Sequence, residues 1–305
     1  MDLIDELVRI LRDSRNAVFF GGTGMATEFD VPNAHDEESI YSKGLNRKLR
    51  PDEMASHSFL VNHTEEFFEF FREHRILRNA EPNEGHKALA ELEQRGILKA
   101  VVTQDVEGLH QLVGSKTVYE LHGSILRWHC VECGKVYPVG YVLQEENRPV
   151  PYCKDCDGIV RPSVVLYEEE MDAKAAEGAV RAIREADTLI VGDVSLMAYP
   201  AAGLIAFFRG KHLVLISKME TKADKHAELA IRSGSGTVLA EAVGRLKDSV
   251  NGTVYKRPDM PESKRFFAKR VRQWVLHPDN DPELVEEIRN GQHPGLEILL
   301  EKGDV

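Results

Sequence analysis

The stretch FFGGTGMATEFDVPNAHDEES, residues 19–39, decides the fold class. An apolar run ends in two glycines, and Thr23 and Gly24 follow them. A strand that opens into a glycine-rich loop is typical of a dinucleotide-binding α/β sheet, because glycine lets a phosphate approach the backbone closely. The next residues include Phe29 and Asp30, which are bulky or acidic. The loop therefore keeps the backbone shape of a phosphate site without all of its side-chain chemistry.

Short apolar runs recur after this loop, and helix-like segments separate them. Such alternation predicts a parallel sheet that is covered by helices on both faces. Ligands of these sheets bind outside the carboxyl ends of the strands. The fold class that we expect is α/β, with a Rossmann-like parallel sheet. The apolar runs lie at 17–20, 99–104, 188–192 and 212–217.

Two long segments interrupt this alternation. Residues 36–85 look helical and rich in aromatic side chains, and residues 126–162 hold all the cysteines. We interpret them as two insertions that form a smaller domain, a zinc ribbon with helices. The core then spans residues 1–248. Residues 249–305 are predicted to form a C-terminal helical extension that packs on the core or mediates homo-oligomer formation.

The composition limits the classes of partner. The formal net charge is −11, so nonspecific binding to nucleic acid is not expected. No apolar run reaches the roughly 20 residues that span a bilayer, so no membrane partner is expected. The N-terminus reads as an amphipathic helix rather than a signal peptide, and a cytoplasmic protein follows. Its predicted apolar face consists of Leu3, Leu7, Ile10 and Leu11.

The four cysteines follow the spacing C-x2-C-x19-C-x2-C, which is typical of a zinc ribbon. Four thiolates at this spacing suit a tetrahedral zinc ion, and because they close the site the metal is expected to be structural. The alternatives are four buried thiols or two disulfides, and a reducing cytosol disfavours disulfides. The predicted ligands are Cys130, Cys133, Cys153 and Cys156.

Several motifs in order give the chain its resemblance to the sirtuins, the NAD-dependent protein-lysine deacylases. TQDVEGLHQLVGS, ELHGSILRWHCVEC and RPSVVLYEEEMD resemble sirtuin motifs, and so do SLMAYPAAGL and LVLISKMET. The similarity covers roughly residues 1–248. It implies a large dinucleotide-binding domain, a small domain with zinc and helices, and a cleft between them.

The resemblance also implies a reaction and its residues. The acyl group of an acyl-lysine peptide moves to the ADP-ribose part of NAD, and nicotinamide leaves. His122 matches the histidine base that activates a ribose hydroxyl, a role that suits imidazole near neutral pH. Without the motif, His122 is better explained as a packed structural histidine. Val164 and Val165 match the strand that pairs with the substrate peptide, although they also fit an ordinary buried strand.

The chain departs from the family where NAD is expected to bind. Asp105 replaces an asparagine that contacts ribose and water, and Glu107 replaces an aspartate of the nicotinamide pocket. Asp193 and Val194 stand in place of a glycine and a threonine near the phosphates, and Ser217 replaces an asparagine near the adenosine ribose. The resemblance makes Asp105 a second catalytic candidate beside His122. The cofactor-binding candidates are Gly22, Thr23, Gly24, Gln104, Glu107, Asp193, Ser195 and Ser217.

The charge of Asp193 predicts weak affinity for NAD. Two like charges 4 Å apart repel by about 4 kcal/mol at an effective dielectric constant near 20. This prediction assumes that the carboxylate faces the pyrophosphate. The alternative is that Asp193 points to solvent and a shifted loop replaces it.

Three functions fit these observations. The first is an NAD-dependent deacylase with weak or altered activity, which rests on His122, Gln104 and the cysteine pairs. The second is altered ribosyl chemistry, such as hydrolysis of NAD or a nucleoside, with Asp105 and Glu107 stabilising a positive ribose carbon. The third is a non-catalytic module that binds a peptide, a nucleotide or another subunit. Binding of NAD or ADP-ribose separates the third function from the other two.

Overall fold

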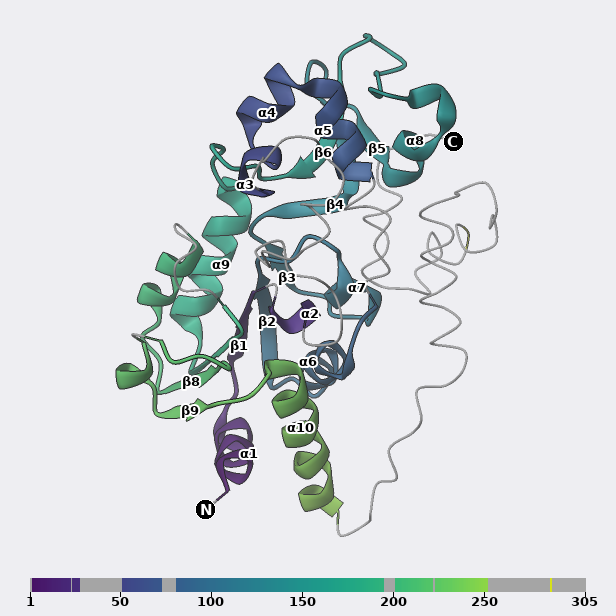
Figure 1. Ribbon diagram of the computed structural model, residues 1–305. Coiled ribbons are helices and arrows are strands. Elements are labelled where there is room, and N and C mark those ends of the chain that lie inside the picture. The colour runs from purple at the N-terminus through teal and green to yellow at the C-terminus, as the bar shows by residue number, and fades with distance from the viewer. Residues whose placement is uncertain are drawn as a thin grey trace.

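The structure is a computed structural model, and it describes residues 2–22, 24–27, 51–72, 81–194, 201–221, 223–251 and 286. Several expectations lie outside these residues. They include the loop residues Phe29 and Asp30, the candidates Thr23 and Ser195, and nearly all of the C-terminal extension. The described part forms two sheets, each with its own helices (Figure 1).

The larger sheet has six parallel strands in the order β3-β2-β1-β7-β8-β9. Counted along the chain within this sheet, the order is 3-2-1-4-5-6, which is that of dinucleotide-binding Rossmann sheets. The order reverses between β1 and β7, so the loops after these two strands flank the expected ligand crevice. The expected α/β fold is confirmed. The strands are β1 (Ala17–Gly21), β2 (Leu98–Thr103), β3 (Val118–Glu120), β7 (Thr188–Gly192), β8 (His212–Ile216) and β9 (Leu229–Ile231).

Alternation along the strands divides the interior into two cores. In β1 every residue is buried, and Phe19 belongs to one core while Val18 and Phe20 belong to the other. Successive side chains of a strand point to opposite faces, so a strand covered on both sides must be apolar throughout. The same division holds in β7, where Ile190 joins the core of Phe19 and Leu189 joins that of Phe20.

Helices cover both faces of this sheet (Figure 1). Residues of α1, α6 and α10 pack in the core of Phe19, and residues of α9 and η4 pack in the core of Phe20. One sequence expectation fails: Leu3 is 49% exposed, because the buried face of the first helix is completed by Ile4 and Val8. The helices are α1 (Leu3–Asp13), α6 (Glu84–Gln94), α9 (Ala173–Glu185), η4 (Ala201–Phe207) and α10 (Ser235–Asn251).

The smaller sheet has the order β5-β4-β6 and is antiparallel. It shares a third core with α4 and α5, in which Phe68 and Phe71 contact the fully buried Trp128 and Phe67 packs against both of these phenylalanines. The aromatic run of the sequence is thus the core of this unit. Its elements are α3 (Pro51–Met54), α4 (His57–Asn62), α5 (Thr64–Phe71), β4 (Gly123–Cys130), β5 (Val136–Pro138), α8 (Val139–Leu143), η3 (Glu145–Asn147) and β6 (Val160–Val164).

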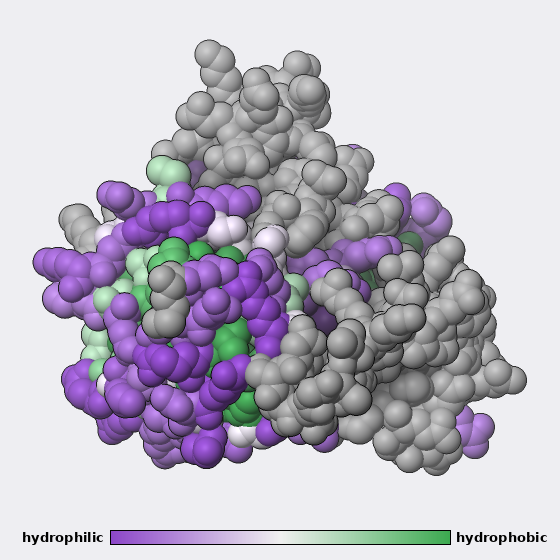
Figure 2. Space-filling model, turned by 90° about the horizontal axis from the view of Figure 1, so that it is seen from below, coloured by the Kyte–Doolittle hydropathy of each residue, from purple (hydrophilic) through white to green (hydrophobic). Residues whose placement is uncertain are grey.

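Three short helices complete the described chain. Helix α2 (Gly24–Thr27) follows β1, α7 (Leu109–Leu112) follows β2, and η5 (Asp224–His226) precedes β9. Seen from the end where α1 begins, the described surface is mostly hydrophilic, and hydrophobic residues are visible between the hydrophilic side chains (Figure 2). Among the described residues, no helix is both long and apolar enough to cross a membrane.

Candidate functional site

The loops after β1 and β7 meet at the reversal of the strand order. A Cβ atom on Gly22 would lie 2.7 Å from the carbonyl oxygen of Asp193, and one on Gly24 would lie 2.5 Å from the Cβ of Asp193. Neither distance is compatible with a side chain. The two glycines are therefore required for the close approach of these loops at the expected ligand-binding edge of the sheet.

Asp193 has a structural role that its neighbours in sequence do not reveal. Its backbone is left-handed, with a φ of 47°. Its Oδ2 accepts a hydrogen bond of 2.7 Å from the backbone N–H of Ser235, the first residue of α10. A carboxylate at a helix N-terminus is stabilised by the free N–H groups and by the helix dipole. The charge that we expected to oppose a pyrophosphate is thus bound to a helix end.

The segment after β2 brings further predicted residues to the same edge. Gln104 is buried, its backbone N–H donates to Gly21, and its side-chain nitrogen has no partner in the described structure. Glu107 is half-buried, and its carboxylate accepts from the N–H of Val106. A buried amide nitrogen without a partner is a donor available to a bound ligand.

Asp105 is 3% exposed, and neither of its carboxyl oxygens has a partner in the described structure. Burial, and after it the charge of Glu107, raises the pKa of Asp105 well above its ordinary value. A protonated carboxyl group has one donor and one acceptor, as an asparagine amide has a donor and an acceptor group. In that form Asp105 can serve the polar contacts that an asparagine makes at this position.

His122 lies between β3 and β4, next to the same loop. Its Nδ1 is 3.2 Å from the backbone carbonyl oxygen of Gln104, so a proton on Nδ1 is held there and Nε2 is left as a free lone pair. Burial lowers the pKa of His122 below its ordinary value, and the hydrogen bond to Gln104 opposes this only in part. The ring is therefore neutral near pH 7 and suits the role of a proton acceptor.

Gly123 sets the position of His122. Its φ is 76°, and a Cβ atom there would lie 2.0 Å from the carbonyl oxygen of Ser163. Only glycine allows β4 to approach β6 this closely. Directly beside it, the N–H of Val165 donates to the carbonyl oxygen of His122 at 2.9 Å. The backbone N–H of Val165 is therefore already used within the chain, and a peptide that pairs here must use other groups.

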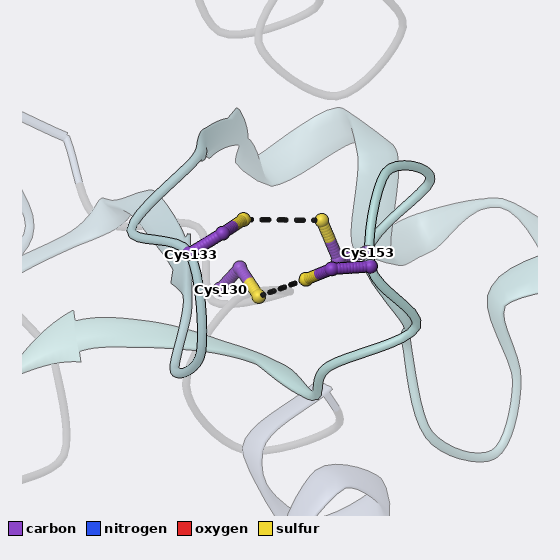
Figure 3. Close-up of side chains that lie close together, drawn as sticks. Cys130, Cys133 and Cys153 are labelled. Atoms are coloured by element: carbon purple, nitrogen blue, oxygen red, sulfur yellow. Dashed lines mark hydrogen bonds between the residues drawn. The ribbon is translucent and has the colours of Figure 1, made fainter.

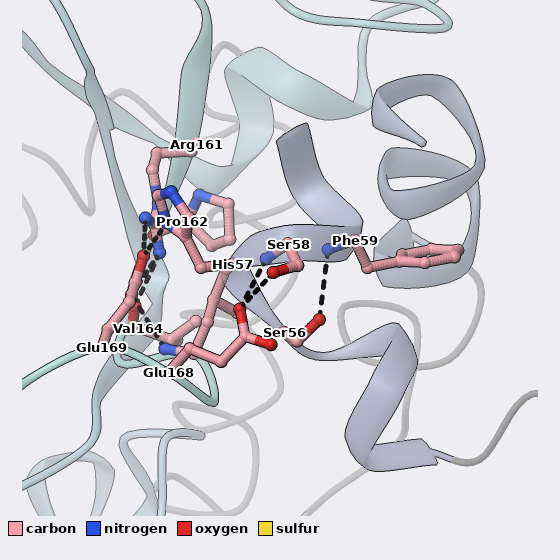
Figure 4. Close-up of polar contacts among 10 residues, drawn as sticks. Ser56, His57, Ser58, Phe59, Arg161, Pro162, Val164, Glu168 and Glu169 are labelled. Atoms are coloured by element: carbon pink, nitrogen blue, oxygen red, sulfur yellow. Dashed lines mark hydrogen bonds and ion pairs between the residues drawn. The ribbon is translucent and has the colours of Figure 1, made fainter. Parts of the chain in front are cut away.

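An ion-pair network fixes the segment that follows Val164 (Figure 4). Arg161 pairs with both carboxylate oxygens of Glu169, which also accepts from the N–H of Leu166 and lies 2.9 Å from Nδ1 of His57. Burial acts to raise the pKa of Glu169, but the hydrogen bonds from Arg161 and Leu166 outweigh it and lower the pKa to about 2.

The preceding residue, Glu168, extends this attachment to α4. Glu168 has a φ of 76°, and its Oε2 accepts from the N–H and the hydroxyl of Ser58 at 2.8 and 2.6 Å (Figure 4). The carboxylate therefore binds an N–H in the first turn of α4, where negative charge is favoured. Sequence reasoning did not assign roles to Arg161, Glu168 and Glu169. The run of three glutamates after VVLY was the available signal.

The four cysteines come together at one end of the smaller sheet (Figure 3). The Sγ atoms of Cys130 and Cys156 are 3.4 Å apart, those of Cys133 and Cys153 are 3.6 Å apart, and all four lie within 4.8 Å of one another. Sulfur ligands of a tetrahedral zinc ion lie about 3.8 Å apart when the Zn–S bonds are about 2.3 Å. The cluster is compatible with zinc, and no disulfide joins these thiols.

The two cysteine turns have matching backbones. Gly134 donates to the carbonyl of Cys130, and Asp157 donates to that of Cys153, each at 3.0 Å and each from a residue with positive φ. A Cβ atom on Gly158 would lie 2.8 Å from the sulfur of Cys130, so a larger residue there would enter the cluster. The hydroxyl of Tyr137 donates to the sulfur of Cys153 at 3.1 Å, as outer-shell partners of metal ligands often do.

The remaining candidate at the sheet edge is Ser217, directly after β8. It is half-buried, its N–H donates to Ile231, and its hydroxyl accepts from the N–H of Met219 at 3.3 Å. The described cofactor-binding candidates thus follow the ends of β1, β2, β7 and β8, and their roles stay predictions. Thr23 and Ser195 lie outside the described residues.

Comparison with known proteins identifies relatives of the whole core. The model of the Sir2 family matches residues 22–200. An NAD-dependent protein deacetylase of Clostridium acetobutylicum is 49% identical over 243 residues, which are 80% of this chain and 99% of the relative. One of Clostridium perfringens is 48% identical over 243 residues, which are 79% of this chain and 99% of the relative.

Solved structures give the same result. A structure described as a Sir2–p53 peptide–NAD+ complex has a TM-score of 0.70 and 32% identity, and the match covers 82% of this chain and all of the other. A complex of a Sir2 homolog with NAD has a TM-score of 0.73 and 29% identity, and covers 81% of this chain and 94% of the other.

The close contact between Gly123 and Ser163 predicts that a larger residue at position 123 lowers stability. This steric loss can be measured apart from the strain of a positive φ. Gly123→Ala should lower the free energy of unfolding by about 2–4 kcal/mol, because the added methyl group meets a backbone carbonyl in a left-handed conformation. Gly114→Ala is the matched control, since Gly114 has a φ of 96° but open space around it. Urea denaturation of both variants measures the difference. Equal losses would show that the approach of β4 to β6 is not tight.

Proposed function

Because the chain belongs to the Sir2 family, we propose that it is an NAD-dependent protein-lysine deacylase with His122 as its general base. The observation that carries this proposal is the state of His122. The ring is neutral, its Nδ1 is held by the Gln104 carbonyl, and its Nε2 is free to accept a proton. Its neighbours in the fold are the glycine-lined strand ends at which a dinucleotide binds.

The polar groups at this edge fit NAD. Gly22 and Gly24 provide backbone that a phosphate can approach, with Thr23 between them. The buried side-chain nitrogen of Gln104 and the carboxyl group of Asp105 are unsatisfied in the described structure and can take ribose or amide contacts. NAD, when bound, supplies the ADP-ribosyl acceptor of the acyl group. The other proposed contacts come from Glu107, Asp193, Ser195 and Ser217.

Two observations reduce the expected repulsion of NAD. The carboxylate of Asp193 is bound to the N-terminus of α10, and the carboxyl group of Asp105 favours its neutral form. Hydrolysis of NAD or a nucleoside rested on charged carboxylates at both Asp105 and Glu107, and the expected weak affinity for NAD favoured a non-catalytic module. Both alternatives lose their main support, and the relatives named as deacetylases do not favour them.

The smaller unit supports the same function. We propose that it is a domain built from the insertions 36–85 and 126–162, with structural zinc held by its four cysteines. The segment of Val164 and Val165, held between His122 and α4, is proposed to contact an acyl-lysine peptide through backbone groups that remain free. A cytoplasmic location, the absence of a nucleic-acid partner, and an oligomer through residues 249–305 stay predictions.

Replacing His122 tests the proposed base. His122→Ala should abolish transfer of an acetyl group from a lysine peptide to ADP-ribose, a loss of at least about 100-fold, because the variant has no imidazole to accept the proton of the ribose hydroxyl. Nicotinamide release and peptide deacetylation, both followed by chromatography, are the measurements. His129→Ala is the control, since His129 lies on β4, the strand that begins directly after His122, and contacts Ser163 instead. Full activity of the His122 variant would remove this residue from the mechanism.

The pH dependence follows from the same ring. Protonation of His122 removes the base, and burial places its pKa below the ordinary value near 6.5. The acid limb of kcat/KM should therefore have its midpoint below pH 6.5, with activity constant from there to neutral pH. A pH–rate profile in a constant-ionic-strength buffer measures this. A midpoint above 6.5 would mean that the ring is not held as the structure shows.

Removal of one cysteine tests the proposed zinc. Cys153→Ser should release the metal and unfold the smaller unit, because structural zinc sites contribute folding free energy directly. Elemental analysis after dialysis against metal-free buffer should find about one zinc fewer per chain in the variant than in the native protein. Tyr137→Phe removes the hydroxyl that donates to the Cys153 sulfur and accepts from the N–H of Lys154, but it leaves all four thiolates in place and should keep the zinc. A metal-free native chain with a stable fold would contradict the proposal.

A further inference from the structure

Three buried side chains from three separate elements lie close together near the edge of the large sheet at which the cofactor is expected to bind. His86 lies in the first turn of α6, Asp105 follows β2, and His110 lies on α7; they are 0%, 3% and 2% exposed. Each offers a ligand atom, and these atoms all lie within 4.8 Å of one another. The rings of His86 and His110 are 4.7 Å apart between centroids.

This cluster concentrates the unsatisfied polar atoms of the interior. In the described part of the chain, eleven buried side-chain atoms have no hydrogen-bond partner, and five of them belong to these three residues. They are Nε2 of His86, both ring nitrogens of His110 and both carboxyl oxygens of Asp105. A buried polar group without a partner costs about 1–3 kcal/mol. Five such atoms in one place indicate a partner that the chain does not supply.

The position of His86 is fixed by Asn83 through its Nδ1, and its Nε2 belongs to the cluster of unsatisfied atoms. Its Nδ1 is 2.9 Å from the side-chain oxygen of Asn83, the N-cap residue of α6. The amide nitrogen of Asn83 in turn donates to the carbonyl of Met25 at 2.6 Å, which fixes the orientation of that amide. The backbone N–H of Asn83 also lies 3.3 Å from this Nδ1, so Nδ1 can accept from that N–H or donate to the amide oxygen. When Nδ1 carries the proton and donates to the oxygen, Nε2 is a free lone pair, and metal-binding histidines commonly have such an outer hydrogen bond.

The chemistry of the three side chains selects a class of ligand. Two imidazoles and one carboxylate are a donor set for late first-row divalent metals, whereas magnesium and calcium prefer oxygen ligands alone. We propose that His86, Asp105 and His110 form a second metal site, distinct from the four cysteines, that binds a divalent cation such as Zn²⁺ or Co²⁺. Three protein ligands leave a coordination position for water or for an oxygen atom of a bound ligand.

Cobalt distinguishes this site from the cysteine cluster. Co²⁺ bound by thiolates shows intense near-ultraviolet charge transfer, and Co²⁺ bound by nitrogen and oxygen shows only weak visible bands. The full-length protein, with zinc retained at its cysteines, is incubated overnight with Co²⁺ and examined by absorption and elemental analysis. The expected result is one additional equivalent of cobalt with weak visible bands and no loss of zinc. Zinc should displace this cobalt.

Variants assign the cobalt to these side chains. Asp105→Asn has the same size and should weaken cobalt binding by at least about 10- to 100-fold. Glu107→Gln is the matched control, because it removes a neighbouring carboxylate that is not in the cluster and should keep cobalt binding. Retained zinc and an unchanged circular dichroism spectrum show that each variant is folded. His110→Gln should behave as Asp105→Asn does.

Three results would overturn the proposal. The first is that the protein binds no cobalt beyond the amount that exchanges with zinc at the cysteines. This would mean that water or a proton satisfies the polar atoms of the cluster. The second is charge transfer from thiolates together with loss of zinc. The third is equal affinity in the native protein and the Asp105→Asn variant. These outcomes are read from cobalt and zinc content alone, and the deacylase proposal is tested separately by nicotinamide release from the native protein and the His122→Ala variant.

Discussion

The contact between Asp193 and the glycines after β1 is the constraint on which the functional edge depends. Gly22 and Gly24 admit the backbone of Asp193, whose carboxylate then reaches the first N–H of α10. One residue thus joins a strand end, a glycine loop and a helix N-terminus. Without the two glycines, the loops after β1 and β7 could not close together at the reversal of the strand order, where a Rossmann sheet binds its ligand.

Much of this fold could be predicted from sequence, and its limits have physical causes. The buried strands β1, β7 and β8 appear as short apolar runs because both of their faces are covered. Strands β3 and β9 were not predicted, since three residues at a sheet edge carry little pattern. The cap formed by Asp193 was hidden because its partner Ser235 is 42 residues away. The sequence predicted which strand end carries this carboxylate, but it did not predict the backbone N–H that the carboxylate binds.

In the candidate site, too, features set by neighbouring residues could be predicted from sequence, whereas contacts between distant segments could not. The cysteine spacing predicted a compact cluster, because each pair forms its own turn. The residue type and motif around His122 predicted a base, but the carbonyl that holds its Nδ1 belongs to another loop. His86 was not singled out at all, since it reads as an ordinary residue of a helical first turn. Its significance appears only where β2 and α7 bring Asp105 and His110 beside it.

Asp105 connects the proposed chemistry with the proposed metal site. It follows directly after Gln104, whose backbone carbonyl oxygen accepts the hydrogen bond from His122. A cation held by Asp105 and His110 would fix the segment between β2 and α7 from the inside, and Gln104 lies in that segment. The position of the base therefore depends on the same short loop that carries a metal ligand. Because Asp105 cannot at once bind a cation and offer a neutral carboxyl group to a ribose, occupancy of the cluster and contacts to the cofactor compete for one side chain.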